Sequence, residues 1–336
     1  MRGSILNRQP AGLFRPDHCV DVVLDTDTYN EIDDAYALAY LLRSPEHVRL
    51  KAIYAAPFLL RGRSVSPMDG MEKSYLEAKK LLELYDMSYP DQRPAPPLYH
   101  GCGDFLPDER TAVDSEAVED LIARASQYSA ENPLYVIGIA ALTDIASAIL
   151  KAPEIVEKIV VIWLGGAAHH FHSAREFNLN EDVAAARVVF RSGVAMVHIP
   201  CFGVADTCLT TKPELCHWLQ GKNPLCDYLV QSTVELAEGM GARGAWSRVL
   251  WDAAAAGWLM DGNHSAPVIF PDGTGDVYSD KLVPRPLPTF EGTYVFSPEL
   301  PLYRYVYHIK RDLLVTDLFQ KLSSPAIEEN SEKWEV

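Results

Sequence analysis

Apolar runs of strand length alternate with helix-like segments through the first two hundred residues, and this alternation limits the fold more than any other feature. The runs cover residues 20–24, 48–54, 98–100, 134–137, 159–164 and 195–199. Runs such as 159–164 lack alternating polar residues, so both faces of the strand are expected to be buried, as in a parallel sheet covered by helices. The sequence therefore predicts an α/β fold: a doubly wound, mostly parallel sheet flanked by helices.

Helical spacing separates these runs, at residues 33–43, 68–84, 116–127, 144–151 and 182–191, with Thr143 expected to cap the fourth segment. After residue 200 helical segments follow one another (212–220, 225–237 and 252–259), which predicts a helical cap region in the C-terminal half. A Pro/Gly-rich stretch (267–292), strands at 293–296 and 304–308 and a helix at 316–322 complete the chain. We expect an N-terminal extension over 1–19, one α/β domain over 20–322 and a polar, disordered tail over 323–336.

Charge and cysteine usage narrow the choice of partners and compartment. The chain has 336 residues and a net charge of −16, which argues against nucleic acid or an anionic membrane as a partner. Its six cysteines form no C-x-x-C pair, as expected for reduced thiols. The first 18 residues lack the apolar core of a signal peptide, and no apolar run is long enough to span a bilayer. We expect a soluble, cytoplasmic protein.

A cluster of five carboxylates follows the first apolar run. It comprises Asp25, Asp27, Glu31, Asp33 and Asp34. Like charges this close repel and raise one another's pKa unless a cation or a proton is shared among them. Helix capping by Asp33 and Asp34 explains only two of the acids. Hard carboxylate ligands suit Ca²⁺ or Mg²⁺, so the cluster predicts a divalent-metal site at the end of the first strand.

Further candidate residues lie at the carboxyl ends of other expected strands, where α/β sheets bind ligands. They include His100, Ile139 and the pair Gly165-Gly166. Glu176 and Asn178, in the loop beyond, can together accept from and donate to a sugar hydroxyl. A loop histidine among His169, His170 and His172 suits contact with substrate better than zinc binding, because neither cysteines nor a helical pair accompany it.

Five motifs in order resemble the inosine–uridine-preferring nucleoside hydrolase family. They are Asp25-Thr26-Asp27 with Asp33-Asp34-Ala35, the stretch Ile139-Ala140-Ala141-Leu142-Thr143-Asp144-Ile145-Ala146, Leu164-Gly165-Gly166, Glu176-Phe177-Asn178, and Trp251-Asp252. Together they extend over roughly residues 20–260. The resemblance implies hydrolysis of the N-glycosidic bond of ribonucleosides to free base and ribose, by a water that a bound Ca²⁺ activates, in a homodimer or homotetramer.

The resemblance also implies roles for single residues. The Ca²⁺ would be held by Asp27, Asp34, Asp252 and the backbone carbonyl of Ile139, and Asp27 would deprotonate the water. Ribose hydroxyls would be bound by Asp33, Glu176 and Asn178. The remaining substrate contacts would come from Asn30, His100, Leu164 and Trp251. Such a site suits the chemistry, because an anionic pocket stabilises the positive charge that develops on the sugar.

Three departures from the family pattern bear on these roles. Two additional residues separate Asp27 from Asp33, so Asn30 can compete for the metal. Trp251 replaces a histidine that protonates the leaving base, and an indole has no titrating proton to give. Either His170 or His172 supplies that proton, or the base leaves by another route, or Trp251 only stacks on it. The stretch 55–60 also lacks an asparagine that the family commonly has.

Two other functions fit part of the sequence. Strand residues followed by Asp25-Thr26-Asp27-Thr28 match a haloacid-dehalogenase-type phosphohydrolase, with Asp25 as nucleophile and Asp27 as acid/base on Mg²⁺. That function leaves Asp34, Glu176 and Asp252 without roles. A catalytically silent nucleoside- or sugar-binding protein is the third hypothesis, motivated by the tryptophan that precedes Asp252.

Overall fold

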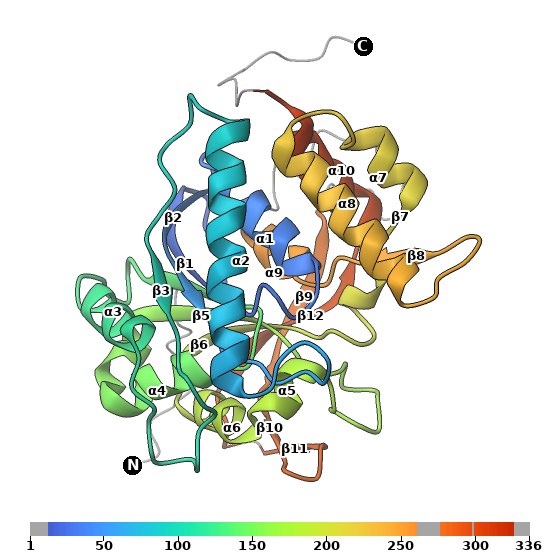
Figure 1. The fold of residues 1–336 in the computed structure, drawn as a ribbon. Helices are drawn as coiled ribbons and strands as arrows, with labels where there is room; N and C mark the ends of the chain where they lie inside the picture. The colour runs from blue at the N-terminus through green and yellow to red at the C-terminus, as the bar shows by residue number, and fades with distance from the viewer. Residues whose placement is uncertain (1–12, 261–275, 298, 326–336) are drawn as a thin grey trace, which may run out of the picture.

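The structure is a computed structural model that describes residues 13–260, 276–297 and 299–325. Its centre is an eight-stranded sheet in the order β3-β2-β1-β4-β5-β6-β12-β9 (Figure 1). The strands are β1 (Val20–Thr26), β2 (Val48–Ala55), β3 (Leu98–His100), β4 (Leu134–Gly138), β5 (Ile159–Leu164), β6 (Ala195–Ile199), β9 (Tyr278–Pro284) and β12 (Leu302–Ile309). All neighbouring pairs are parallel except β12 and β9, which confirms the predicted mostly parallel sheet.

Helices cover both faces of this sheet. They are α1 (Asp33–Leu42), α2 (Pro67–Ser88), α3 (Glu116–Ala125), α4 (Thr143–Lys151), α5 (Phe177–Glu181), α6 (Val183–Arg191), α7 (Lys212–Trp218), α8 (Pro224–Gly239), α9 (Ala253–Gly257) and α10 (Arg311–Ser323). One core contains residues of α1, α2, α8, α9 and α10, and the other contains residues of α3, α4 and α6. Successive residues of β5 alternate between the two cores: Ile162 packs in the first and Trp163 in the second. This alternation is why the strand is apolar throughout.

The strand order reverses direction at β1, because the chain adds β2 and β3 on one side of it and β4, β5 and β6 on the other. Such a switch point opens a crevice beyond the carboxyl ends of the two central strands. Asp27 follows β1 and Ile139 follows β4. The two strands are joined there, where the Ile139 N–H donates to the Asp25 carbonyl at 2.9 Å. The fold thus brings the first acidic motif beside the second motif.

Several local predictions were wrong. Thr143 does not cap α4 but begins it, and its hydroxyl donates to Asp182, which is itself the N-cap of α6. The expected loop at 176–178 forms the start of α5, because the Glu176 carboxylate accepts the backbone N–H groups of that first turn. The Pro/Gly-rich stretch contains β9 and β10 (Pro286–Pro288), and β10 forms a hairpin with β11 (Tyr294–Phe296).

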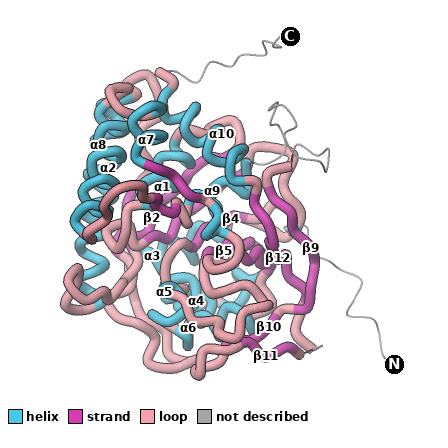
Figure 2. Tube along the Cα trace, turned by 90° about the vertical axis from the view of Figure 1, so that its right-hand side faces the viewer, coloured by secondary structure: helices cyan, strands magenta, loops and turns pink. Residues whose placement is uncertain are grey.

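Strand β9 was missed because it is an edge strand, antiparallel to β12, where prolines are tolerated (Figure 2). The last helix, α10, begins five residues before the predicted start at residue 316. Residues 1–12 and 326–336, which hold most of the expected extension and tail, lie outside the described residues. Within the described residues, no helix is both long enough and apolar enough to cross a membrane.

Candidate active site

A pocket of about 230 Å³ lies beyond the carboxyl ends of β1, β4, β5 and β6. Ten of the twelve predicted site residues line it: Asp27, Asn30, Asp33, Asp34, Ile139, Leu164, Glu176, Asn178, Trp251 and Asp252. A groove of about 1060 Å³ between the 105–110 loop and α6 is larger, but it contains none of them. The smaller pocket is therefore the candidate active site.

Three buried aspartates converge in this pocket from distant parts of the chain. One carboxylate oxygen from each of Asp33, Asp34 and Asp252 lies within 4.8 Å of the other two. Asp33 and Asp34 begin α1, and Asp252 precedes α9, which packs against α1. The Asp252 N–H also donates to Asp33 Oδ2 at 3.2 Å. A divalent cation fits this arrangement, because hard oxygen donors at such spacing suit Ca²⁺ or Mg²⁺.

Without a bound cation, the burial of these carboxylates destabilises their ionised form. Desolvation raises the pKa of Asp34 to about 6, against its ordinary value of 3.8. Burial first, and then the charges of the neighbouring acids, also holds the pKa values of Asp33 and Asp252 well above the usual range. Thr26 partly offsets this for Asp34, since its hydroxyl donates to Asp34 Oδ1 at 2.5 Å. A bound cation would remove the repulsion that protonation otherwise relieves.

Asp27 lies beside this group and is 1% exposed. Burial, followed by the negative charges of Asp34 and Glu181, raises its pKa well above the usual range. Asn30 orients the side chain, because its Nδ2 donates to Asp27 Oδ2 at 3.2 Å and its backbone N–H donates to the Asp27 carbonyl at 2.7 Å. Asn30, in the lengthened turn, thus folds back onto Asp27.

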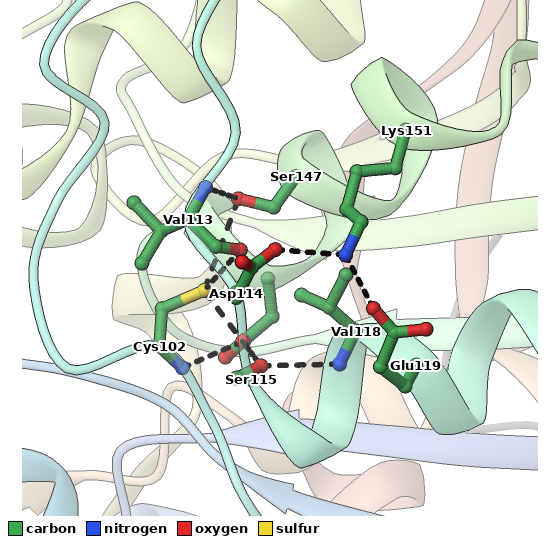
Figure 3. A network of polar contacts seen from close by, with 9 residues as sticks. Cys102, Val113, Asp114, Ser115, Val118, Glu119, Ser147 and Lys151 are labelled. Atoms are coloured by element: carbon green, nitrogen blue, oxygen red, sulfur yellow. Dashed lines mark hydrogen bonds and ion pairs between the residues drawn. The ribbon is translucent and has the colours of Figure 1, made fainter.

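Asp25 does not belong to the pocket, although it is part of the acidic run. Its side chain is fully buried beside Asp144, and burial and the charge of Asp144 raise its pKa. Asp144 Oδ1 in turn accepts the Cys102 N–H at 2.8 Å and the Ser115 hydroxyl at 3.0 Å. Figure 3 shows the polar network around Cys102 and Ser115 that continues from this pair. A phosphohydrolase with Asp25 as nucleophile is disfavoured, because this carboxylate does not line the pocket.

Backbone hydrogen bonds hold Glu176 and Asn178 firmly in the pocket lining. The Glu176 carboxylate accepts the N–H groups of Gly166 at 2.7 Å, Asn178 at 3.1 Å and Leu179 at 3.2 Å. The Asn178 side chain donates to the Leu164 carbonyl at 3.1 Å. Glu176 therefore has a structural role as the cap of α5, and both side chains have fixed orientations toward the end of β5.

The rest of the pocket wall is mainly apolar and was not predicted residue by residue. It is formed by Leu60, Phe177, Cys201 and Phe202 together with Trp251. The Phe202 ring packs edge-on against Trp251, with centroids 5.7 Å apart. Cys201 and Phe202 follow β6, so the rule that places ligands at strand ends could have identified them.

Two predicted residues lie outside the pocket lining. His100 stacks on Tyr75, with ring centroids 3.8 Å apart, and its Nδ1 lies 3.2 Å from a Glu116 carboxylate oxygen. His170 is exposed and packs against Phe171. It lies near Gly203, where an added Cβ would be 3.3 Å from the imidazole. Gly203 follows Phe202 in the chain, so His170 lies close to the segment that carries this aromatic residue.

Comparisons with known proteins agree with the motifs. A family model described as inosine-uridine preferring nucleoside hydrolase matches residues 22–283. The chain belongs to this family, which confirms the resemblance seen in the sequence.

Similar proteins carry names from the same family. The chain is 31% identical to the non-specific ribonucleoside hydrolase RihC of Salmonella agona over 194 residues, which are 52% of this chain and 59% of that protein. The match to RihC of Escherichia coli strain SMS-3-5 is also 31% identical and covers the same shares. The aligned part thus spans about three fifths of the length of these relatives.

Solved structures support the fold. A plant nucleoside hydrolase, PpNRh1, aligns with a TM-score of 0.68 at 18% identity over 92% of this chain and all of that one. A purine-preferring ribonucleoside hydrolase from Gardnerella vaginalis aligns with a TM-score of 0.66 at 18% identity, over 90% of this chain and 98% of that one.

Proposed function

We propose that this protein hydrolyses the N-glycosidic bond of ribonucleosides to free base and ribose. The observation that carries the proposal is the meeting of Asp33, Asp34 and Asp252 in one pocket with Glu176 and Asn178. This places a cluster suited to a cation next to polar groups suited to a sugar. Membership of the nucleoside hydrolase family supports the same reaction.

We propose Ca²⁺ as the cation. Asp27, Asp34, Asp252 and the carbonyl of Ile139 would hold it, as all four line the pocket. Asp33, which shares the acidic group, is assigned to a ribose hydroxyl. When bound, the cation would lower the pKa of a water and orient the sugar.

Asp27 is assigned as the base that removes a proton from the attacking water. Burial and the neighbouring acids raise the pKa of Asp27 in the absence of a cation, and a cation held beside it would lower that pKa, so the carboxylate would be ionised and able to accept a proton near neutral pH. Asn30 holds Asp27 Oδ2 in place for this step. Glu176 and Asn178 would bind the remaining ribose hydroxyls, and their hydrogen bonds to the backbone keep them oriented. The carboxylates stabilise the positive charge that develops on the ribose ring.

The leaving base is assigned to the aromatic wall formed by Trp251, Phe177 and Phe202. Flat aromatic rings stack favourably on a nucleobase. Trp251 cannot supply a titrating proton, so His170, close to the segment that carries Phe202, is the candidate acid.

We also propose a cytoplasmic, homo-oligomeric enzyme of nucleoside salvage, with no nucleic acid or membrane partner. The six unpaired cysteines support a reducing compartment. Sedimentation of the purified chain measures the oligomeric state, and we expect a dimer or a tetramer.

Release of free base from a panel of ribonucleosides, with and without a chelator, tests the proposed reaction. We expect release from at least one nucleoside, loss of activity in the chelator, and recovery with Ca²⁺. The Asp34→Ala variant should be folded and inactive. Phosphate release from phosphomonoesters without base release would favour the phosphohydrolase, and ribose binding with neither activity would favour the silent binding protein.

A further inference from the structure

An ion pair joins the lengthened turn of the first acidic motif to the strand that precedes Asp252. Glu31, in the turn between Asp27 and Asp33, lines the pocket. Its Oε2 lies 2.6 Å from Nη2 of Arg248, and the Arg248 side chain is only 18% exposed. The two residues are 217 positions apart in the sequence.

Arg248 is placed by a small two-stranded sheet outside the central one. It is the middle residue of β8 (Ser247–Val249), which pairs antiparallel with β7 (Leu209–Thr211). Leu250, the residue that follows β8, donates its N–H to the Cys208 carbonyl at 2.9 Å. The chain then passes directly into Trp251 and Asp252. A short, hydrogen-bonded segment therefore connects Arg248 to these two pocket residues.

The charges around the pocket make this cation unusual. Six acids line the pocket, namely Asp27, Glu31, Asp33, Asp34, Glu176 and Asp252, and among its described lining residues there is no lysine or arginine. Of the ion pairs formed between described residues, the pair with Arg248 is the one that includes a pocket acid. Arg248 offsets one negative charge at the pocket's edge and also ties that edge to the segment of Asp252.

We propose that Glu31 and Arg248 form a clamp that positions Asp252 and Trp251 against Asp33 and Asp34. Both are positioning residues, since they act through the segment 249–252. A second contact from the same turn, the hydrogen bond from the Asp252 N–H to Asp33 Oδ2 at 3.2 Å, depends on the same alignment. The lengthened turn between Asp27 and Asp33 would thus have a structural role, because it carries the Glu31 carboxylate that holds the segment 249–252. The effect on catalysis rests on the proposed function, but the effect on this segment does not.

Arg248→Met separates positioning from simple electrostatics. It keeps much of the apolar side-chain length and removes a positive charge near an anionic site. Electrostatics alone predicts tighter Ca²⁺ binding, because a repulsive cation is gone. The clamp predicts weaker binding by about tenfold, the lower end of the loss seen when residues that orient metal ligands are changed. Arg248→Lys, which retains the charge and the pair with Glu31, should bind nearly as the wild type does.

The experiment combines Ca²⁺ titration calorimetry with hydrogen exchange of residues 247–253 in the full chain. Lys212→Met is the matched control, since it breaks an exposed ion pair, with Glu238 at 2.8 Å, in the same part of the molecule. We expect Arg248→Met, but not the control, to accelerate exchange in this segment and weaken Ca²⁺ binding. The double variant, Arg248→Met with Glu31→Gln, should exchange no faster in this segment than Arg248→Met alone. Both substitutions break the same ion pair, so their effects should not add.

Unchanged exchange in Arg248→Met, or Ca²⁺ binding as tight as or tighter than wild type, would overturn the clamp. Base release by each variant is measured in parallel, and a higher KM with little change in kcat is expected. A wild-type protein that releases no base would contradict the proposed function alone. The exchange measurement requires neither bound metal nor turnover, so it decides the clamp in that case too.

Discussion

Replacement of Asp34 by asparagine separates the destabilising effect of the acidic cluster on the fold from its proposed role in binding Ca²⁺. The change removes one buried charge but keeps the size of the side chain and an oxygen that accepts the Thr26 hydroxyl. We expect the Asp34→Asn variant to be more stable than the wild type in a chelator. We also expect it to lose the stabilisation that Ca²⁺ gives the wild type.

The size of the effect follows from the pKa of this carboxyl. Burial raises the pKa from 3.8 to about 6, so the folded protein binds this proton more tightly than the unfolded chain does. The stability that the proton supplies is complete below the unfolded pKa and is lost as the pH rises through about 6. At about 1.4 kcal/mol per pKa unit, the loss is about 3 kcal/mol at pH 8. The asparagine variant does not undergo this loss of stability. Its hydrogen bond from Thr26 is weaker, however, which costs about 1 kcal/mol.

Urea unfolding at pH 8, in chelator and in Ca²⁺, measures both quantities. The variant should gain about 2 kcal/mol in chelator. The wild type should gain about 2.7 kcal/mol when Ca²⁺ is at a hundred times its Kd, and the variant much less. Asp144→Asn is the control, because Asp144 is a buried acid with a raised pKa that lies outside the pocket, and it should keep the calcium response. An Asp34→Asn protein that is less stable in chelator and still responds to Ca²⁺ as the wild type does would refute the reasoning.

Three further predictions concern the base, the core and the pH profile. Trp251→Ala should raise the KM for nucleosides about tenfold in steady-state kinetics, because about 1.4 kcal/mol of stacking on the base is lost. An unchanged KM would show that Trp251 does not contact the base. Trp163→Ala, in the core beside Phe190, should lower the free energy of unfolding by about 3–5 kcal/mol without changing Ca²⁺ affinity in calorimetry. Because Asp27 must be ionised to accept a proton and its pKa is raised, kcat/KM should fall with acid at a higher pH than for an ordinary carboxylate. Additional Ca²⁺ should move that fall to lower pH in pH–rate profiles, and a profile insensitive to Ca²⁺ would contradict the role of Asp27.

The sheet was predictable from the sequence because its strands are buried on both faces. Apolar runs such as Ile159–Leu164 have no polar alternation, and burial by two helical layers is what such a run requires. The edge strand β9 lacks that pattern: it pairs on one side only, and its residues are mostly half-exposed or exposed. Its pairing with β12 depends on contacts across the fold, which a local pattern does not contain.

The site was predictable only in part. Strand ends place Asp27 and Ile139 together by topology, but nothing local brings Asp252 to them, and only the resemblance to a family did so. The orientation of Asp25 follows from its position in the strand. Side chains alternate along a strand, so Asp25 faces the same side as Val23, into the layer that contains Cys102, and away from the pocket.

The two histidines illustrate a different limit. His100 ends β3 as expected, yet its ring stacks on Tyr75 from α2, so the strand end fixes the backbone but not the direction of the side chain. His170 lies in the loop between β5 and α5 and does not line the pocket, although Leu164 and Glu176 at the two ends of that loop do. Loop conformation depends on tertiary contacts, here with Gly203, that the sequence does not reveal.

A crystal structure of the protein with Ca²⁺ and ribose tests the central claim most directly. The account predicts one ion in the pocket, at about 2.3–2.6 Å from oxygens of Asp27, Asp34 and Asp252 and from the Ile139 carbonyl, with ribose hydroxyls in the same shell. An ion bound elsewhere, or an Asp252 carboxylate turned away from Asp34 in the calcium-bound protein, would contradict it.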